Sequence, residues 1–206
     1  MQKKCELPDH QAILSFWFEG LTDDDRILKN ENPYLKWFRS SPQIDREIIF
    51  QFKESLMQAD QGCFSGWEKN PFQSTALIIL FDQLPRNMFR NTAKMFQYDA
   101  KALSIAQKLI LKGEDLSLPL LYRQFVYMPF SHAEDLQCQK KAVQYFENLF
   151  KDSERRTSLN NKFYKSQYEH ALKYADIINR FGRFPHRNKI LNRSSTPEEE
   201  AFTGKS

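Results

Sequence analysis

The sequence predicts an all-α protein of about eight helices. Apolar residues recur at intervals of three and four along most of the chain, the spacing that gathers them on one face of a helix. No segment alternates apolar and polar residues, and no Asn-Gly or Asp-Gly dipeptide marks a hairpin. With 206 residues, of which 41% are hydrophobic, we expect a single domain over residues 1–206 with a sizeable core.

Capping residues followed by proline predict the starts of the first helices. Pro8-Asp9 precedes the apolar segment that contains "ILSFWF", and Ser41-Pro42 opens a second run at helical spacing. Asn70-Pro71 opens the segment "STALIILFDQL", which is apolar on most sides and should be buried. We expect this buried helix to end at Pro85.

Glycine, proline and capping boxes divide the rest of the chain. A helix over residues 93–112 should stop at Gly113, and one over residues 117–128 should stop at Pro129. Capping boxes at Ser131-x-x-Glu134 and at Thr196-x-x-Glu199 predict two further helix starts. The polar connector 151–162 precedes a long helix that should end at Gly182.

Charge and cysteine content narrow the class of protein. The net charge of +4 occurs in nucleic-acid binders and in many soluble enzymes alike, so it does not separate the two classes. Cys5, Cys63 and Cys138 are odd in number and far apart, which indicates buried thiols of a reducing compartment rather than a disulfide framework or a zinc site. The apolar run at residues 13–18 is too short for a signal peptide or a membrane span. We therefore expect a soluble cytoplasmic protein.

The segment "RFGRFPHRN", residues 180–188, is rich in arginine and follows the longest predicted helix. No acidic residue occurs between Asp176 and Glu198. Arginine presents a planar fork of donors that suits carboxylates and phosphates. These arginines therefore either bind an anion or meet acidic residues from elsewhere in the chain. The alternative structural role is to bind carbonyl oxygens at helix ends.

Two further polar clusters are candidates for chemistry: "FDQLPRNMFRNT", residues 81–92, and "MPFSHAEDLQ", residues 128–137. Asp82 and Arg86 lie four apart, which fits an ion pair on one helix as well as a binding site. Glu134 is already explained as a capping residue, and a histidine in a turn is more often hydrogen-bonded than a metal ligand. The spacing His132-x-Glu134 does not fit a helical metal site, so we expect no metal and no cofactor.

Five long motifs resemble a bacterial family, domain-of-unknown-function family 924, over nearly the whole chain. The motifs are "ILSFWF", "KWFRSSPQIDREI", "LFDQLPRNMFRNTAKMFQYDAKAL", "YMPFSHAEDLQCQ" and "RFGRFPHRNKILNRSSTPEEEAF". The resemblance implies an all-helical fold of the tetratricopeptide-like superfamily without clean repeats. It implies no activity, substrate, cofactor or catalytic residue.

The chain departs from that family's pattern at three positions. Asn91 and Asn192 stand where the family usually has glycine, and asparagine is the residue that best tolerates positive φ after glycine. We therefore expect both asparagines in left-handed turns. Ala133 replaces a usual serine after His132, which argues against a role for a hydroxyl there.

The leading functional hypothesis is a polar cleft at helix ends that binds an anionic small molecule. The expected ligand-binding residues are Arg86, Asn87, Arg90, Arg183, His186, Arg187 and Asn188. One alternative is a tetratricopeptide-like scaffold that holds a protein or peptide. Another is an enzyme of unknown reaction class, in which His132 or His186 acts as general acid–base and Glu134 or Asp82 orients it. We expect neither nucleic acid nor membrane as a partner.

We further expect "RFGRFPHRN" to dock against "DQLPRN" and against the start of the helix at His132. Phe181 and Phe184 should be buried and should draw Arg183 and His186 inward, where Asp82, Asp99 or Glu134 would pair with them. Within this arrangement Arg183 is expected to be structural and Arg187 to face the cleft.

Overall fold

The computed structural model describes residues 9–31, 33–39 and 41–204, and over these residues the chain is helical with no strand. The α-helices are α1 (His10–Phe18), α2 (Tyr34–Phe38), α3 (Pro42–Asp60), α4 (Pro71–Ile78), α5 (Leu84–Met88), α6 (Asp99–Leu111), α7 (Leu120–His132), α8 (Leu136–Arg155), α9 (Asn161–Phe181) and α10 (Pro197–Thr203). Short helical turns are η1 (Ser65–Lys69), η2 (Ile79–Gln83), η3 (Ala93–Phe96), η4 (Glu114–Ser117) and η5 (Pro185–Arg187), of which η2 is a π-turn. The all-α prediction is confirmed.

The predicted helix starts are confirmed by their capping hydrogen bonds. The Asp9 carboxylate accepts from the backbone N–H of the second residue of α1. The Ser41 hydroxyl accepts from the third residue of α3, and the Asn70 side chain accepts from the second and third residues of α4. At α10, Thr196 and Glu199 make both hydrogen bonds of the capping box. Each such cap stabilises a helix end by about 1 kcal/mol.

Left-handed residues occupy the predicted positions. Gly113 and Gly182 have φ of 71° and 70°, so the chain leaves α6 and α9 as expected. Asn91 and Asn192 have φ of 62° and 54°, which confirms the turns inferred from the two replacements of glycine.

The two predicted proline stops are wrong. Pro85 lies in the first turn of α5, which continues from α4 through the π-turn η2. A π-turn is wider than an α-turn and relieves the contact between a proline ring and the carbonyl four residues earlier. Pro129 lies inside α7, which ends at His132. Proline costs about 3 kcal/mol inside a helix. The burial of large α7 side chains such as Phe125 and Phe130, about 1.5–3 kcal/mol each, outweighs that cost.

The predicted capping box at Ser131 is also wrong, because α7 continues through that residue. The next helix, α8, begins at Leu136, and the Asp135 carboxylate caps it by accepting from the Cys138 N–H at 2.7 Å. Glu134 is thereby left in the short connection between α7 and α8, where it makes contacts described below. The helix expected over residues 93–112 is divided into η3 and α6.

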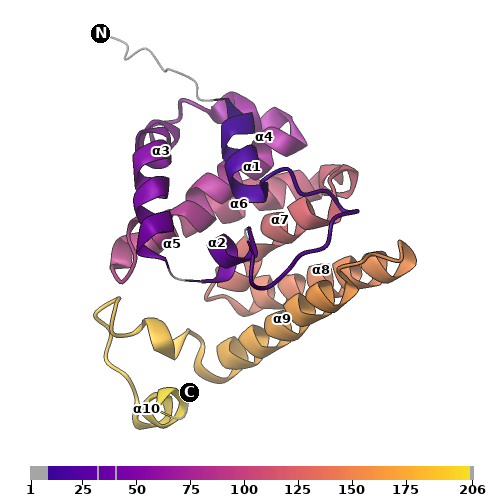
Figure 1. Cartoon of the computed structure of the whole chain (residues 1–206). Helices are drawn as coiled ribbons and strands as arrows, with labels where there is room; N and C mark the ends of the chain where they lie inside the picture. The colour runs from indigo at the N-terminus through magenta and orange to yellow at the C-terminus, as the bar shows by residue number, and fades with distance from the viewer. Residues whose placement is uncertain (1–8, 32, 40, 205–206) are drawn as a thin grey trace.

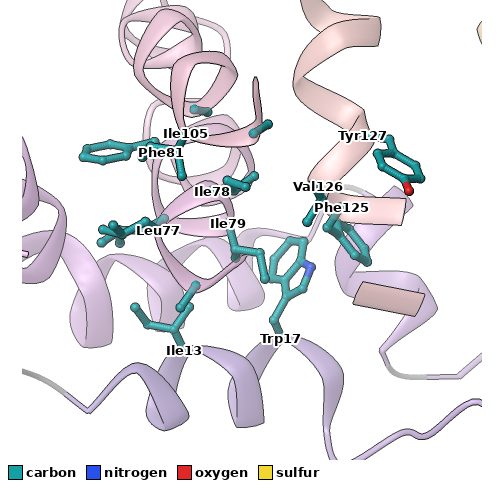
Figure 2. Packing of buried hydrophobic residues seen from close by; sticks show 14 of the residues in the cluster. Ile13, Trp17, Leu77, Ile78, Ile79, Phe81, Ile105, Phe125, Val126 and Tyr127 are labelled. Atoms are coloured by element: carbon teal, nitrogen blue, oxygen red, sulfur yellow. The ribbon is translucent and has the colours of Figure 1, made fainter. Parts of the chain in front are cut away.

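The core forms where α1, α4, α6 and α7 pack together. Figure 2 shows Ile13 and Trp17 of α1 against Ile78 and Ile79, with Phe125 of α7 close to the tryptophan. The rings of Trp17 and Phe125 meet edge to face at 5.6 Å between centroids. Residues 74–84, the segment "STALIILFDQL", are all buried, as their composition predicts.

The helices α8 and α9 form an antiparallel hairpin beside this core, and the C-terminal segment follows from it (Figure 1). Because the chain reverses at Gly182, the segment after α9 returns toward the end of α7 and the start of α8, where Phe184 and Arg193 contact Glu134. That return places the arginine-rich segment beside the other two polar clusters. None of the helices in the described part of the chain has the length and apolarity to cross a membrane.

The cysteines depart in part from expectation. Cys138 is a free, half-buried thiol, whereas Cys63 is disulfide-bonded, so the prediction of a thiol is wrong at that position. Cys5 lies outside the described residues. The cytoplasmic location stays a prediction.

Candidate functional site

The three polar clusters meet around one cavity of about 520 Å³. It lies between the η2–α5 junction, the end of α7 and the η5 turn, and α2, α8 and α9 complete its wall. The polar side chains that line it are Gln83, Arg86, Ser131, His132, Gln167, His170, Tyr174, His186 and Arg187. Aromatic rings supply much of the remaining wall: Tyr34, Trp37, Phe38, Phe96, Phe146 and Phe184.

Arg86 is held in place by two carboxylates. Its guanidinium makes two parallel hydrogen bonds of 3.0 Å to Asp99, and Asp82 lies 3.4 Å away on the preceding turn. Arg86 also donates to the backbone carbonyl of Asp82. The charge of this arginine is therefore compensated within the protein.

Asp82 and His132 form a buried pair in the cavity wall. The Asp82 side chain is fully buried, and its Oδ1 lies 2.8 Å from His132 Nδ1. Burial raises the pKa of Asp82, but the charges of Arg86 and His132, with hydrogen bonds from His132 and Gln83, outweigh it and lower the pKa to about 2. Asp82 is therefore an ionised carboxylate that fixes the orientation of the imidazole ring.

The π-turn η2 places this pair. Asp82 and Gln83 are its last two residues, and Gln83 donates to the Asp82 carboxylate and to Met128 Sδ at 3.6 Å. Single π-turns within longer helices occur often at functional sites, because they turn side chains away from the regular α-helical register. Here the turn directs Asp82 toward the end of α7.

Arg187 has no ionic partner among the residues that the structure describes. Its side chain is 8% exposed, and its guanidinium lies between the rings of Phe184 and Phe96, at 4.4 Å and 4.6 Å from their centroids. Its Nε has no hydrogen-bond partner, and no ion pair within residues 9–31, 33–39 and 41–204 includes it. Burial and the neighbouring charge of Arg86 lower its pKa. Arg187 is thus a buried cation in the wall of a cavity.

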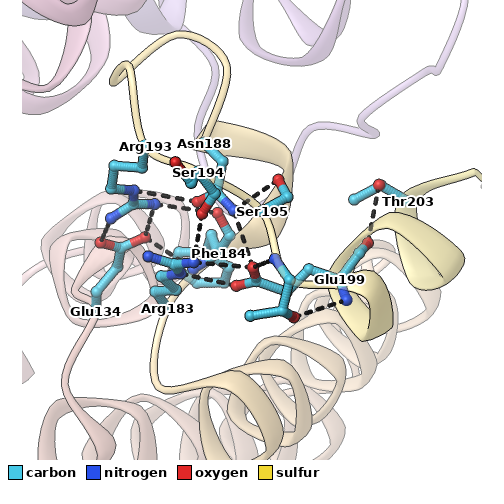
Figure 3. A network of polar contacts seen from close by, with 10 residues as sticks. Glu134, Arg183, Phe184, Asn188, Arg193, Ser194, Ser195, Glu199 and Thr203 are labelled. Carbon is cyan, nitrogen blue, oxygen red and sulfur yellow. Dashed lines mark hydrogen bonds and ion pairs between the residues drawn. The ribbon is translucent and has the colours of Figure 1, made fainter.

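The other arginines of the C-terminal segment pair with carboxylates (Figure 3). Arg183 binds Glu199 through two hydrogen bonds of 2.7 Å and 2.8 Å, and Arg193 binds Glu134 at 2.6 Å and 2.9 Å. Arg180 pairs with Glu198. These contacts hold the segment in place, and they leave Arg187 as the exception within it.

The structure separates the predicted site residues into three groups. Arg86, His132, His186 and Arg187 line the cavity, and Asp82 lies directly behind it. Asn87 and Arg90 line a neighbouring cavity of about 320 Å³, where both bind Asp45. Arg183, Asn188 and Glu134 line neither of these cavities and belong to the polar network of Figure 3.

Some of the expected contacts are wrong. Glu134 does not orient His132 but binds Arg193 and accepts the Phe184 N–H at 2.7 Å, so Asp82 is the carboxylate that contacts His132. Arg183 pairs with Glu199, which was not among its expected partners.

The burial expected of the segment is only partly correct. Phe184 is buried as predicted, but Phe181 is half-buried against Phe202. His186 remains exposed, and Arg187 is the residue drawn inward, because the η5 turn that begins at Pro185 directs it there. Desolvation and the adjacent Arg187 lower the pKa of His186.

Several cavity residues were missed from the sequence. Ser131 was interpreted as a cap, yet it is 6% exposed and lines the cavity, and its hydroxyl has no hydrogen-bond partner in the described part of the chain. Gln167, His170 and Tyr174 project from α9 at spacings of three and four, a polar stripe within an otherwise amphipathic helix. That stripe is the signal that could have found them. In the described part of the chain, no group of three or more potential ligands could hold a metal ion.

Comparisons with known proteins agree on the family, whose members they describe as proteins of unknown function. The model of a family described as bacterial protein of unknown function, DUF924, matches residues 13–206. The chain is similar to the solved structure of a protein of unknown function from Agrobacterium tumefaciens, with a TM-score of 0.77 and 34% identity over 96% of this chain and 97% of that one. No curated protein matches. On these matches, and on the motifs that form the cavity, the chain belongs to the DUF924 family.

Proposed function

We propose that the cavity binds an anionic small molecule and that Arg187 is its principal contact. The observation that carries this proposal is a guanidinium that is more than nine-tenths buried, faces a cavity and has no carboxylate partner among the described residues. An unpaired buried charge costs several kcal/mol, so such a residue is unusual unless another group compensates it. A bound carboxylate or phosphate would do so through the planar fork of donors.

The neighbours of Arg187 support the same role. The Ser131 hydroxyl is buried in the wall of the same cavity and has no hydrogen-bond partner within residues 9–31, 33–39 and 41–204. His132 presents the ring edge that does not face Asp82. Each is a hydrogen-bond donor or acceptor for a polar ligand. Ligand pockets commonly combine apolar walls with a few such polar groups, in volumes of about 300–1,000 Å³.

A thermal-shift screen of carboxylated and phosphorylated metabolites at concentrations to a few millimolar tests the proposal. We expect at least one anion to raise the melting temperature of the wild type, and not that of Arg187→Met. Arg180→Met is the matched control, because Arg180 is exposed and lines no part of the cavity. The proposal would be contradicted if no anion of the panel changed the melting temperature, or if the shifts in melting temperature were equal in Arg187→Met and Arg180→Met.

The alternative of a peptide scaffold has less support. A scaffold would present an apolar or charged groove along helix faces, whereas most of the polar residues here gather at the end of α7 and at the η2 and η5 turns, beside one polar stripe on α9. A partner recovered from lysate that survives moderate salt, and whose binding is unaffected by Arg187→Met, would favour the scaffold instead.

A second candidate function is an enzyme that acts on the bound anion. The specific observation is the contact between Asp82 and His132, since a buried carboxylate on Nδ1 leaves Nε2 available as a general acid–base. Any anion found in the screen should then be converted slowly when incubated with the protein, as followed by NMR. His132→Gln should abolish conversion without abolishing binding. If every ligand whose binding requires Arg187 remains unconverted after incubation with the protein, the enzyme hypothesis is excluded.

A further inference from the structure

The charges around the cavity limit what kind of anion it can take, and this inference rests on the proposed function. Arg86 already contacts two carboxylates, Asp82 and Asp99, and is compensated by them. Arg187 is the remaining guanidinium of the cavity, and it contacts no carboxylate of the described residues. One uncompensated positive contact calls for one negative charge on the ligand.

A second negative charge would meet an unfavourable field. Asp82 is fully buried and Asp99 is 20% exposed, so solvent screens them weakly, and both lie on the Arg86 side of the same cavity. The exposed side chains of His170 and His186 do not offset them, because partial desolvation and a neighbouring cation, Lys173 or Arg187, lower the pKa of each and favour the neutral ring at pH 8. His132 is the remaining imidazole of the wall, and it already binds Asp82.

The rest of the wall is suited to an apolar body. Phe96 and Phe184 flank the guanidinium on which the anion would lie, and Tyr34, Trp37 and Phe38 supply aromatic surface elsewhere in the cavity. Aromatic walls favour ligands that bury apolar area, at about 25 cal/mol for each Å² removed from water. A volume of about 520 Å³ is larger than acetate or free phosphate needs.

We propose that the ligand is an amphipathic monoanion: a small molecule with a single carboxylate, bound by Arg187, and an aromatic or branched apolar body that contacts the aromatic wall. Phosphomonoesters, which carry two charges at pH 8, and small carboxylates without an apolar body are expected to bind more weakly.

Four related compounds separate these requirements by calorimetric titration of the full chain at pH 8. They are 3-phenylpropionate, its neutral amide, phenyl phosphate and propionate. We expect 3-phenylpropionate to bind at least tenfold more tightly than each of the other three. Arg187→Met should weaken its binding at least tenfold, and Arg180→Met should leave it unchanged.

A second measurement keeps the test independent of the variants. Met95 and Met128 line the cavity, so their ¹³C-labelled methyl groups should shift when an aromatic ring binds there, in proportion to occupancy. Three other methionines remain in the chain, and of these Met57, which is exposed on α3 and does not line the cavity, is the internal reference.

The outcomes distinguish this inference from the proposed function. Tighter binding of phenyl phosphate than of 3-phenylpropionate, lost in Arg187→Met, would overturn the single-charge requirement while the anion site stands. Equal affinity for propionate and 3-phenylpropionate would overturn the apolar body. Equal affinity for the amide and the acid, or no change at either cavity methionine, would overturn both the inference and the anion site.

Discussion

Replacing Arg187 with methionine should stabilise the ligand-free protein. Methionine retains the unbranched stem that packs between Phe96 and Phe184 and removes the buried charge. The unpaired charge costs several kcal/mol, and each desolvated contact with an aromatic face returns about 1–2 kcal/mol. The net gain from the substitution is then about 1–2 kcal/mol, or about 2–8 °C in melting temperature for a chain of this size.

The assay is thermal unfolding of the purified wild type, Arg187→Met and Arg183→Met, followed by circular dichroism without added anions. Arg183→Met is the matched comparison, because it removes the partner of Glu199, a carboxylate that is only 2% exposed. We expect the two variants to move in opposite directions. A loss of stability in Arg187→Met as large as that in Arg183→Met would refute the reasoning, since it would make Arg187 a structural residue.

Three further predictions concern the stability of the residues and turns around the cavity. Because the pKa of Asp82 is lowered from 3.8 to about 2 in the folded protein, its ionised form stabilises the fold by about 2 kcal/mol above pH 4, and this is lost as the pH falls toward 2. Urea unfolding at several pH values should show a shallower acid loss in Asp82→Asn, and an unchanged slope would contradict it. Asn192→Gly should unfold at the same or a higher urea concentration, whereas Asn192→Val should lose about 1–2 kcal/mol at its left-handed φ; equal behaviour would argue against that turn. Thr196→Ala should lose about 0.5–2 kcal/mol with its capping box, and thermal unfolding that matches the wild type would show that α10 contributes nothing to stability.

Local signals in the sequence predicted most of the helices. Caps at Ser41 and Asn70 and the glycine stop at Gly182 act within one helical turn, so their effect does not depend on distant residues. The prediction that the prolines end helices was wrong because the outcome there depends on distant residues. Pro129 lies in α7, where most of the surrounding side chains are buried against other helices, and a local sequence pattern does not reveal that packing.

The site was predicted in outline but not in its pairings. The three clusters could be found as polar residues near helix ends. The arginine-rich segment contains no acidic residue, so its arginines had to find their partners elsewhere. Which arginine remains without a carboxylate partner depends on how the C-terminal segment folds back, because Glu199 binds Arg183 and Glu134 binds Arg193. Those are contacts over 16 and 59 residues of chain, and no periodicity predicts them.

A crystal structure of the protein soaked with 3-(4-bromophenyl)propionate, with anomalous data collected at the bromine edge, tests the anion site at Arg187 most directly. We expect a bromine peak within the cavity, against its aromatic wall, and carboxylate density within hydrogen-bond distance of the Arg187 guanidinium. A bromine peak elsewhere on the protein with an empty cavity, or a ligand in the cavity whose carboxylate points away from Arg187, would contradict it.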